Sequence, residues 1–503
     1  MKQFSVYTFI LITSVFSQGI NLDAFLLDKI QNEILNIQLN ELNRSLWQSP
    51  VNKNNPGETP INIFSKWDKR LQIAPVFAIR YGNTGFEIDS AHVNHSVLWL
   101  SPGLKLNSTI PVISPYSGVM LHVWAEFYKH SAYNLSGNTF LDNTELQLFK
   151  YHPDYSNEFY TFSRKPENGI DFDESQGGFT IYSSSFSLLF GKFKSSLGPF
   201  LRGNFPLSNT IPSIPQFDFK LHTSDHWEFT FKTGELFSDI VDDNLNWIFN
   251  GSHRKAFLKR YLVHHRLDLL FSSKFRLGFY EQVIFGGRTY PLTYINPFQL
   301  YWSAQHALGD LDNVQMGMDI DLLRDDSRFN FAFFMDEWAP FTTFDTENHH
   351  NWFAIQTGYT KIINLKNKQL YFRCEIAALS PQIYTHKFDP NVAEAIHYDY
   401  PIGYWSRGDS IDAWLMVYMQ YSTKLHMQFK IENTLFGEPE YSIGKRFLKG
   451  EIKKRLKYQV EFNYKLKDYI WMDVQTGYLM TKDLYIKNNF FHFQTHFRYN
   501  ISY

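Results

Sequence analysis

The segment Gln305–Asn313, which reads QHALGDLDN, combines amide, imidazole and carboxylate groups within nine residues. Asp310 and Asp312, with Asp319 further along, have the spacing of oxygen ligands for a hard cation. A turn in which Asp and Asn bond their own backbone accounts for the same pattern, and we favour it over a metal site. The remaining polar groups then either pin this loop in the interior or face a bound molecule. Because buried polar groups must find partners, we expect the pinning role.

The other groups with catalytic potential do not form a set of acid, base and nucleophile. Glu281 and Arg288 are expected to form an ion pair in the interior. The adjacent histidines at 264–265 and 349–350 would point to opposite faces of a strand, so neither pair makes a chelate. Ser195–Ser196 lacks the glycine context of an activated serine. We therefore expect no enzymatic activity, no cofactor and no bound metal.

The chain ends in an alternating segment, FFHFQTHFRYNISY, from Phe490 to Tyr503. Apolar and aromatic residues dominate one set of alternate positions, and polar residues fill the other. Successive side chains of a strand point to opposite faces, so this segment has one apolar and one polar face. A soluble edge strand of this kind would aggregate. A closed barrel in a membrane instead places the apolar face in lipid and the polar face in the lumen.

The same period of two recurs along most of the chain. Segments of ten or more residues suit a tilted membrane strand better than a strand of a soluble sheet. Both charge signs occur on the polar faces, so we expect ion pairs across the lumen. At roughly 24 residues per strand and connection, the chain provides about 18 strands. The clearest segments are residues 226–232, 267–279, 425–432, 456–466 and 470–478.

The composition agrees with a membrane barrel. Aromatic residues make up 18% of the chain, mostly 48 Phe and 30 Tyr, as the two aromatic girdles of a barrel require. The mean hydropathy of −0.32 is compatible with this fold, because half of each strand faces a polar lumen. Lys and Arg number 48 and Asp and Glu number 50, so no basic excess indicates a nucleic-acid partner.

These patterns divide the chain into three regions. Residues 1–17 predict a signal peptide, with Lys2 followed by a short apolar run. Residues 18–72 predict an amphipathic periplasmic helical segment and a linker. Residues 73–503 predict a transmembrane β-barrel with lumen-folded and extracellular loops. The expected fold class is all-β: an antiparallel outer-membrane β-barrel of about 18 strands with a short N-terminal periplasmic helical segment. The expected location is a bacterial outer membrane.

Several stretches interrupt the alternation. Gly191–Phe219 contains four prolines, which lack a donor for a β-ladder, so we expect an ordered loop in the lumen or over its mouth. Residues 150–176, 338–351 and 380–410 are long and polar, and we expect them to be extracellular loops. The only cysteine, Cys374, cannot form an internal disulfide and is expected to be an inert thiol.

Three segments together resemble the Wzi family of capsule assembly proteins. The most specific is Tyr280–Leu322, with its Tyr-Ile-Asn-Pro-Phe and its Gln-His-x-Leu-Gly-Asp-x-Asp-Asn. Gly191–Phe219 resembles the family's Gly-Pro and Ser-Asn-x-x-Pro segment, although Leu197 stands where the family usually has tryptophan or tyrosine. The third segment is Phe329–Trp338. The resemblance covers most of residues 75–345 and implies an outer-membrane barrel that acts as a surface lectin for capsular polysaccharide.

We therefore expect a protein that attaches or organises capsular or other surface polysaccharide, without catalysis. Its expected partners are this polysaccharide, outer-membrane lipid and the barrel assembly machinery, which would read the C-terminal strand. The alternative is an outer-membrane porin or substrate channel, and a lumen sealed by paired charges argues against it.

Sugars bind by stacking on aromatic rings and by hydrogen bonds from planar polar side chains. Residues of both kinds occur in the expected loops, with Trp352, Tyr384, Tyr404 and His349 as further members. The candidate polysaccharide or plug-loop residues are Trp302, Gln305, His306, Asp310, Asp312, Asn313, Asp336, Trp338, Trp405 and Arg407.

Overall fold

The fold is seen in a computed structural model of the chain. It describes residues 71–88, 91–112, 119–135, 163–165, 169–183, 185–221, 226–238, 240–242, 247–249, 252–254, 256–272, 274–324, 326–338, 351–365, 368–386, 390–398, 400–422, 424–437, 447–467, 470–482 and 487–500. The expected signal peptide at 1–17 and the helical segment at 18–72 fall outside these residues, except that the first described strand begins at Leu71. His349 and Tyr503 also fall outside them.

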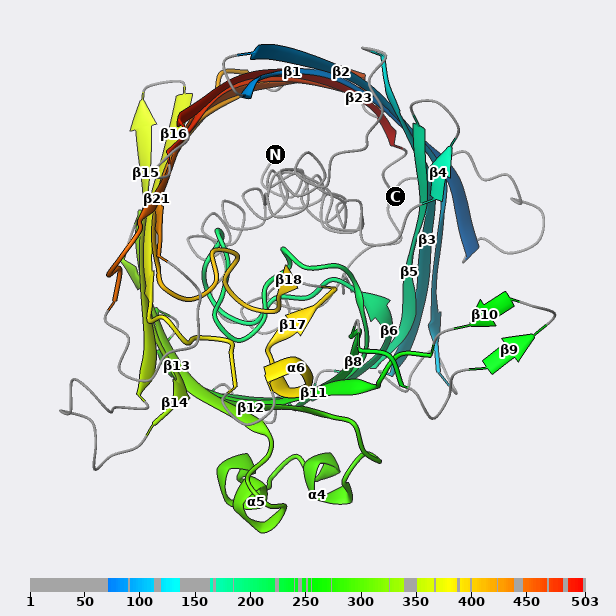
Figure 1. Cartoon of the computed structure of the whole chain (residues 1–503), viewed down its shortest axis with the longest axis vertical. Coiled ribbons are helices and arrows are strands. Elements are labelled where there is room, and N and C mark those ends of the chain that lie inside the picture. The colour runs from blue at the N-terminus through cyan, green and yellow to red at the C-terminus, as the bar shows by residue number, and fades with distance from the viewer. Residues whose placement is uncertain are drawn as a thin grey trace.

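The described strands form one closed antiparallel ring (Figure 1). β1 (Leu71–Ile88) pairs with β2 (Ala91–Pro111) on one side and with β23 (Lys487–Asn500) on the other. Pairing the last strand with the first satisfies both edges, as a membrane barrel requires. The main sheet has 19 strands, of which β4 (Ser163–Lys165) pairs only with β5 (Gly169–Tyr182), so 18 strands make the ring. The predicted fold class and strand number are confirmed.

The other strands of the ring follow each other around it in chain order. They are β3 (Met120–Asn134), β5 (Gly169–Tyr182), β6 (Phe186–Phe193), β7 (Ile214–Leu221), β8 (Trp227–Leu236), β11 (Arg260–Ser272), β12 (Phe275–Gly286), β13 (Asn313–Arg324), β14 (Ser327–Glu337), β15 (Trp352–Leu365), β16 (Lys368–Leu379), β19 (Ser410–Gln420), β20 (Leu425–Phe436), β21 (Lys453–Lys467) and β22 (Ile470–Lys482).

Short elements lie in the connections between these strands. β9 (Trp247–Phe249) pairs with β10 (Ser252–Arg254), and β17 (Ile396–His397) pairs with β18 (Tyr400–Pro401). The described helices are α4 (Leu292–Ile295), α5 (Tyr301–Ala307) and α6 (Pro390–Ala393). In the part of the chain that the structure describes, no helix has the length and apolar character to cross a membrane. Residues 169–176, expected to belong to a loop, are part of β5 instead.

The strands have the two faces that their alternation predicted. On β21, Lys457 and Glu461 point into the ring and are buried, whereas Tyr458 and Tyr464 point outward and are exposed. The ring has a polar inner face because charged side chains there can pair across strands, and an apolar outer face because that side meets lipid. Exposed outward side chains include Phe127, Phe190, Phe271, Phe279 and Ile355.

The two ends of the ring differ in their connections. At one end, β11–β12, β13–β14 and β21–β22 are joined by tight turns. At the other end, the connections at 194–213, 287–312 and 380–409 are long. Barrels of this type keep long loops on the extracellular side, so we orient this long-loop end toward the cell exterior.

Candidate functional site

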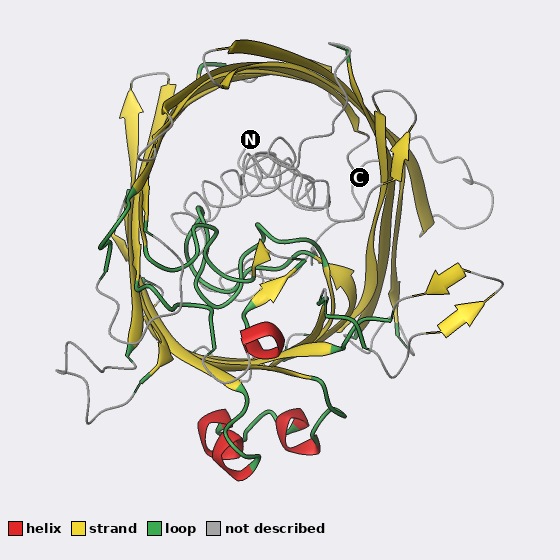
Figure 2. Ribbon diagram, in the orientation of Figure 1, coloured by secondary structure: helices red, strands yellow, loops and turns green. Residues whose placement is uncertain are grey.

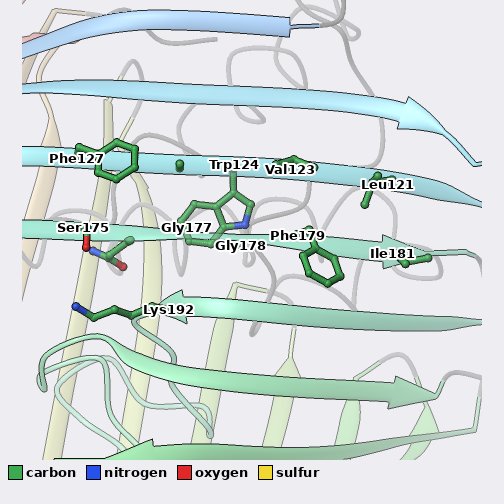
Figure 3. A pocket seen from close by; sticks show the side chains of 12 residues that line it. Leu121, Val123, Trp124, Phe127, Ser175, Gly177, Gly178, Phe179, Ile181 and Lys192 are labelled. Atoms are coloured by element: carbon green, nitrogen blue, oxygen red, sulfur yellow. The ribbon is translucent and has the colours of Figure 1, made fainter.

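The lumen is crossed by two of the long connections, which we call together the plug: residues 194–213, between β6 and β7, and residues 380–409, between β16 and β19. Figure 2 shows loops, the helix α6 and a small pair of strands inside the ring. Pro199, Pro206 and Pro212 lie in this first segment, outside the strands of the ring. Pro215 lies in β7 opposite Lys192, so the loop expected over Gly191–Phe219 covers only residues 194–213. The prediction that residues 380–410 form an extracellular loop is wrong. This second segment enters the ring, and its Tyr384 and Tyr404 are fully buried.

The first plug segment is fixed by a tight turn at Gly198-Pro199. Gly198 has φ +135°, a conformation that L side chains rarely adopt, and a Cβ there would overlap Asn204 Oδ1. The Asn204 side chain accepts from Phe200 N at 2.9 Å and donates to Phe200 O at 3.0 Å and to Ser196 Oγ at 2.8 Å. The glycine and the asparagine together therefore fold the segment back on itself.

The two plug segments bind each other inside the ring. The Tyr384 hydroxyl donates to Phe205 O at 3.0 Å and accepts from Tyr404 N at 2.7 Å. Ser208 N donates to Ile402 O at 2.8 Å. The rings of Phe205 and Tyr404 belong to the largest buried apolar cluster, together with side chains from the inner faces of β12, β14, β15 and β16. The plug is thus one packed unit with an apolar core.

Arg202 is the main electrostatic anchor of the plug. Its guanidinium donates two hydrogen bonds to Glu432, at 3.2 and 3.0 Å, and one to Asp412 at 3.1 Å. Asp412 also accepts from Tyr404 Oη at 2.8 Å and from Trp405 Nε1 at 3.1 Å. The paired charges are almost completely buried, at 2% exposure for Arg202 and 0% for Asp412. Such an arrangement is stable only when every charge has its partners.

A second anchor joins the plug backbone to the wall of the barrel. Glu375, on β16, accepts from Leu201 N at 2.9 Å and from Arg202 N at 3.1 Å. Arg373 donates to Glu375 at 2.6 Å and, through Nη2, to Pro199 O at 3.2 Å. Charge-assisted bonds of this kind are stronger than neutral ones, so the turn at Pro199 is held firmly against β16.

The second plug segment has its own anchors on other strands of the wall. Asp336, on β14, accepts from Tyr384 N and from Gln315 Nε2, the latter at 2.8 Å. Asn313, at the start of β13, donates to Ala393 O at 3.1 Å. Arg260 donates to Val392 O at 2.6 Å and holds α6. Asp336 and Asn313, both candidate site residues, are therefore anchors of the plug.

Burial sets the ionisation of the plug. It raises the pKa of the Tyr384 and Tyr404 hydroxyls above the usual value, and the Asp412 charge raises that of Tyr404 further, so both remain proton donors. Burial lowers the pKa of His397 to about 3, with the charge of Arg260 acting in the same direction. The neutral ring of His397 accepts from Phe237 N at 3.0 Å through Nδ1.

The inner wall is cross-braced by ion pairs, as the mixed charges of the polar faces predicted. Arg266 bonds Asp268 at 2.6 Å and Asp319 at 2.5 Å, and it is buried with both carboxylates. Asp319 is thus an ion-pair partner in the lumen. Similar pairs join neighbouring strands elsewhere on the inner wall: Lys105–Glu126, Lys232–Asp218, Arg328–Asp321 and Lys430–Glu461.

The connection between β12 and β13 lies outside the barrel, and not in the lumen as the pinning prediction requires. Figure 1 shows α4 and α5 beyond the ring, next to β12. The helices pack on the outward-facing side chains of β8, β11, β12 and β13, in a cluster that includes Phe231, Val263, Phe285, Tyr294 and Tyr301. Four candidate residues lie on α5 or just after it, on this outer side: Trp302, Gln305, His306 and Asp310.

The polar side chains of this outer segment bond other groups of the same segment. Gln305 Nε2 donates to Asp310 Oδ1 at 2.7 Å, where Asp310 has φ +59°. Asp312 accepts from Tyr294 Oη at 2.6 Å and forms an ion pair with Arg288. Asp312 and Asn313 are adjacent, yet one holds the outer helices and the other holds the plug.

The expected ion pair between Glu281 and Arg288 is not formed. Glu281 faces outward from β12, where its carboxylate accepts from Tyr301 N at 2.7 Å and from Trp302 N at 2.6 Å. It also bonds His265 Nε2 at 3.1 Å. Glu281 thus supplies the N-terminal cap of α5 from the barrel wall, and Arg288 pairs with Asp312 instead.

The remaining candidates lie at or near the long-loop end. Trp338 follows β14 and is 54% exposed. Trp405 and Arg407 precede β19 in the plug and are half-buried. The Trp405 ring lies 4.8 Å from the Arg202 guanidinium and 5.3 Å from the Arg455 guanidinium. These two cation–π contacts hold the ring in its orientation. These three residues are the candidates whose surfaces remain accessible near the outer mouth of the plug.

The structure does not assemble the other groups into a catalytic or metal site within its described residues. His264 points inward to Gln282, whereas its neighbour His265 points outward, as the alternation of a strand dictates. Ser195 donates to Gln216 at 2.9 Å, in a structural role. No cluster of three or more His, Cys, Asp or Glu side chains suited to a metal ion occurs in the described ranges.

The residues that matter most to the plug were missing from the sequence candidates. Arg202, Asp412, Glu432 and Glu375 carry its anchors, and their partners are up to 230 positions apart in sequence. One signal was present: an arginine inside a proline-rich stretch destined for a barrel interior needs a buried carboxylate. Which carboxylates would meet it could not be read from spacing.

Comparison with known proteins supports the fold. No protein-family model and no curated protein sequence matches the chain. Among solved structures, the Escherichia coli protein Wzi aligns with a TM-score of 0.52 and 11% identity over 85% of each chain. It is described as an outer-membrane protein of group 1 capsule assembly and as a carbohydrate-binding β-barrel.

Two other barrels align over similar lengths. Acinetobacter baumannii OccAB4 gives a TM-score of 0.46 and 13% identity over 85% of this chain and 98% of its own. Pseudomonas aeruginosa OpdK, solved with vanillate, gives 0.47 and 9% over 86% and 99%. The likeness to Wzi shows a shared outer-membrane barrel fold, and at these identities no residue role is transferred.

Proposed function

We propose that this chain attaches or organises capsular or other surface polysaccharide at the outer membrane of a bacterial cell, without catalysing a reaction. The observation that carries the proposal is the plug. A wide diffusion channel needs a continuous water-filled path, and here two packed segments occupy part of the lumen. The Arg202 anchor, with its fully buried carboxylates, favours a lumen that stays closed over one that opens readily.

The accessible groups near the outer mouth suit carbohydrate. Trp338 offers an exposed indole, and Trp405 offers a ring whose orientation is fixed by two guanidinium groups. Arg407 adds a planar donor. A ring that is already held in place loses little entropy when a sugar stacks on it, which favours binding. The sequence resemblance described above and the carbohydrate-binding description of E. coli Wzi support the same ligand class.

The remaining expectations complete this proposal. We infer export by the signal peptide at 1–17, a periplasmic helical segment and linker at 18–72, and a membrane barrel at 73–503 with lumen-folded and extracellular loops. The barrel assembly machinery would recognise the C-terminal strand, and the outer face would contact outer-membrane lipid. Neither a cofactor nor a nucleic acid takes part in this function.

Polysaccharide binding and conductance test the proposal together. Refolded protein is applied to an array of bacterial capsular polysaccharides, and the same preparation is recorded in planar bilayers. Trp338→Ala and Arg407→Ala are expected to weaken binding by roughly tenfold each, the equivalent of ~1.4 kcal/mol. Trp471→Ala, a half-buried tryptophan at the short-turn end, is the matched control and should bind normally.

The result that would overturn the proposal is also defined. A large and steady open-state conductance, with no retention of any polysaccharide, would favour the alternative of a porin or substrate channel. Equal loss of binding in Trp338→Ala and Trp471→Ala would show that the outer mouth is not the binding surface.

A further inference from the structure

The helices outside the barrel have an unusual composition. Residues 289–309 contain no Lys, Arg, Asp or Glu, although they form a connection at the long-loop end. We call residues 289–311, with α4 and α5, the external helical pair. Six of its large apolar side chains are exposed: Leu292 at 82%, Phe298 at 71%, Leu300 at 66%, Trp302 at 56%, Leu311 at 55% and Ile295 at 51%. A water-facing surface loop would have no reason to carry such a face.

The external helical pair does not project from the rim but lies back along the wall. Phe298 stacks on Phe229 of β8 at 5.1 Å, and Tyr301 stacks on His265 of β11 at 4.3 Å. Glu281, which caps α5, lies near the middle of β12, whose bounds are Phe275 and Gly286. The pair therefore reaches down to about the mid-height of the strands.

That height is the height of the lipid-facing band. Phe279, which precedes Glu281 by two residues on β12, points outward and is 44% exposed. Its partner on β11, Leu267, is 38% exposed. An outward carboxylate at this depth would meet hydrocarbon, where an ionisable group is expensive. Glu281 is only 6% exposed, because the external helical pair covers it and bonds it through two backbone N–H groups.

At both ends of α5, backbone N–H groups of the external helical pair have hydrogen-bond partners within the protein, as an apolar medium requires. In lipid, exposed N–H and C=O groups must be satisfied internally. The start of α5 donates to Glu281, as described. At its end, Leu308 N bonds Ala304 O at 3.1 Å, and Asp310 N bonds Gln305 O at 3.0 Å. The single acidic residue of this stretch before Asp312 is Asp310, whose carboxylate is bonded by Gln305.

We propose that the external helical pair is embedded in the outer leaflet of the membrane, where its exposed face binds lipid acyl chains. The occupant is lipid because the pair continues the apolar outer wall, shares its height and carries no Lys or Arg, and because its one carboxylate, Asp310, is bonded by Gln305 of the same pair. The pair then has two roles: it shields Glu281 and His265 from hydrocarbon, and it widens the barrel on one side at the level of the outer leaflet. This inference is independent of the proposed polysaccharide function.

Site-directed spin labelling tests the location. The protein has one cysteine, so Cys374→Ser provides a background for single labels. Labels are placed at Leu292→Cys and at Phe298→Cys, in protein refolded into vesicles of palmitoyl-oleoyl phosphatidylcholine. Phe279→Cys, on the bare outer wall, is the lipid reference, and Lys449→Cys, exposed at the long-loop end, is the aqueous reference. Heat-modifiable migration on gels confirms that each labelled variant has folded.

Collision with oxygen reports lipid, and collision with a water-soluble nickel chelate reports water. We expect the two test labels to show a high oxygen-to-nickel ratio equal to that of the Phe279 label and several-fold above that of the Lys449 label. A ratio equal to that of the Lys449 label would overturn the proposal. Low collision with both reagents, together with dipolar broadening between labels, would also overturn it and would indicate a second copy of the chain on this face.

Discussion

Replacing Arg202 by methionine should release the plug. Methionine keeps most of the side-chain volume but removes the charge that bonds Asp412 and Glu432. Breaking a buried ion pair by removing one partner costs about 3–5 kcal/mol, because the remaining charge stays buried without compensation. Here Glu432 keeps Arg455 at 2.9 Å and Asp412 keeps the donors of the tyrosine, tryptophan and threonine side chains around it. We therefore expect ~3 kcal/mol, at the lower end of this range.

Two measurements detect the lost stability and the loosened plug. Urea unfolding in lipid vesicles measures the free energy of unfolding, and planar-bilayer recordings measure conductance, which should rise in Arg202→Met as the plug loosens. Lys129→Met is the matched control: it breaks an ion pair with Asp173 of 2.9 Å, but both side chains are exposed, at 49% and 78%. An exposed pair contributes at most ~1 kcal/mol.

A second variant separates charge from packing. Adding Asp412→Asn to Arg202→Met removes one uncompensated carboxylate, so part of the lost stability should return. If Arg202→Met is no less stable than Lys129→Met and its conductance stays at the wild-type level, then the buried ion pairs do not hold the plug, and the reasoning is refuted.

Further predictions concern the wall, the plug and the last strand. Phe462→Arg, on the outward face of β21, should cost about 2–4 kcal/mol in vesicles, whereas Leu466→Arg near the short-turn end should cost ~1 kcal/mol or less; equal losses would contradict the depth argument. Because the pKa of His397 falls to about 3 in the fold, the folded state resists its protonation. Stability is then full above the ordinary pKa and should decline by roughly 2 kcal/mol at pH 5; in His397→Gln this decline should disappear from urea titrations. Deleting residues 497–503 removes part of β23 that pairs with β1 and β22, so cell fractionation should find unfolded protein in the periplasm instead of a heat-modifiable barrel. Asp310→Ala should leave conductance unchanged, because this residue lies outside the barrel; increased leakage would argue for a lumen position.

The sequence alone determined the barrel. Alternation of the kind seen at Lys457–Tyr464 assigns each side chain to one of two faces, and the structure has those faces. Strand length and number follow from the same pattern, since each membrane strand must be long enough to cross the bilayer. Pro199, Pro206 and Pro212 predicted the loop between β6 and β7, because the missing N–H is a local property of the residue, whereas Pro215 lies in β7 and did not exclude a strand. Features of this kind depend on neighbours in sequence, so spacing carries them.

Only the tertiary structure decided where the long connections go. Residues 380–409 and 287–312 are both long and rich in aromatic and polar groups, yet one enters the lumen and the other lies on the outer wall. Asp312 and Asn313 are adjacent in the chain and anchor elements on opposite sides of the wall. Arg202 meets carboxylates that are 210 and 230 residues away. Closing the ring brings these groups together, and the side on which a loop finds partners for its buried polar groups depends on contacts that no local pattern encodes.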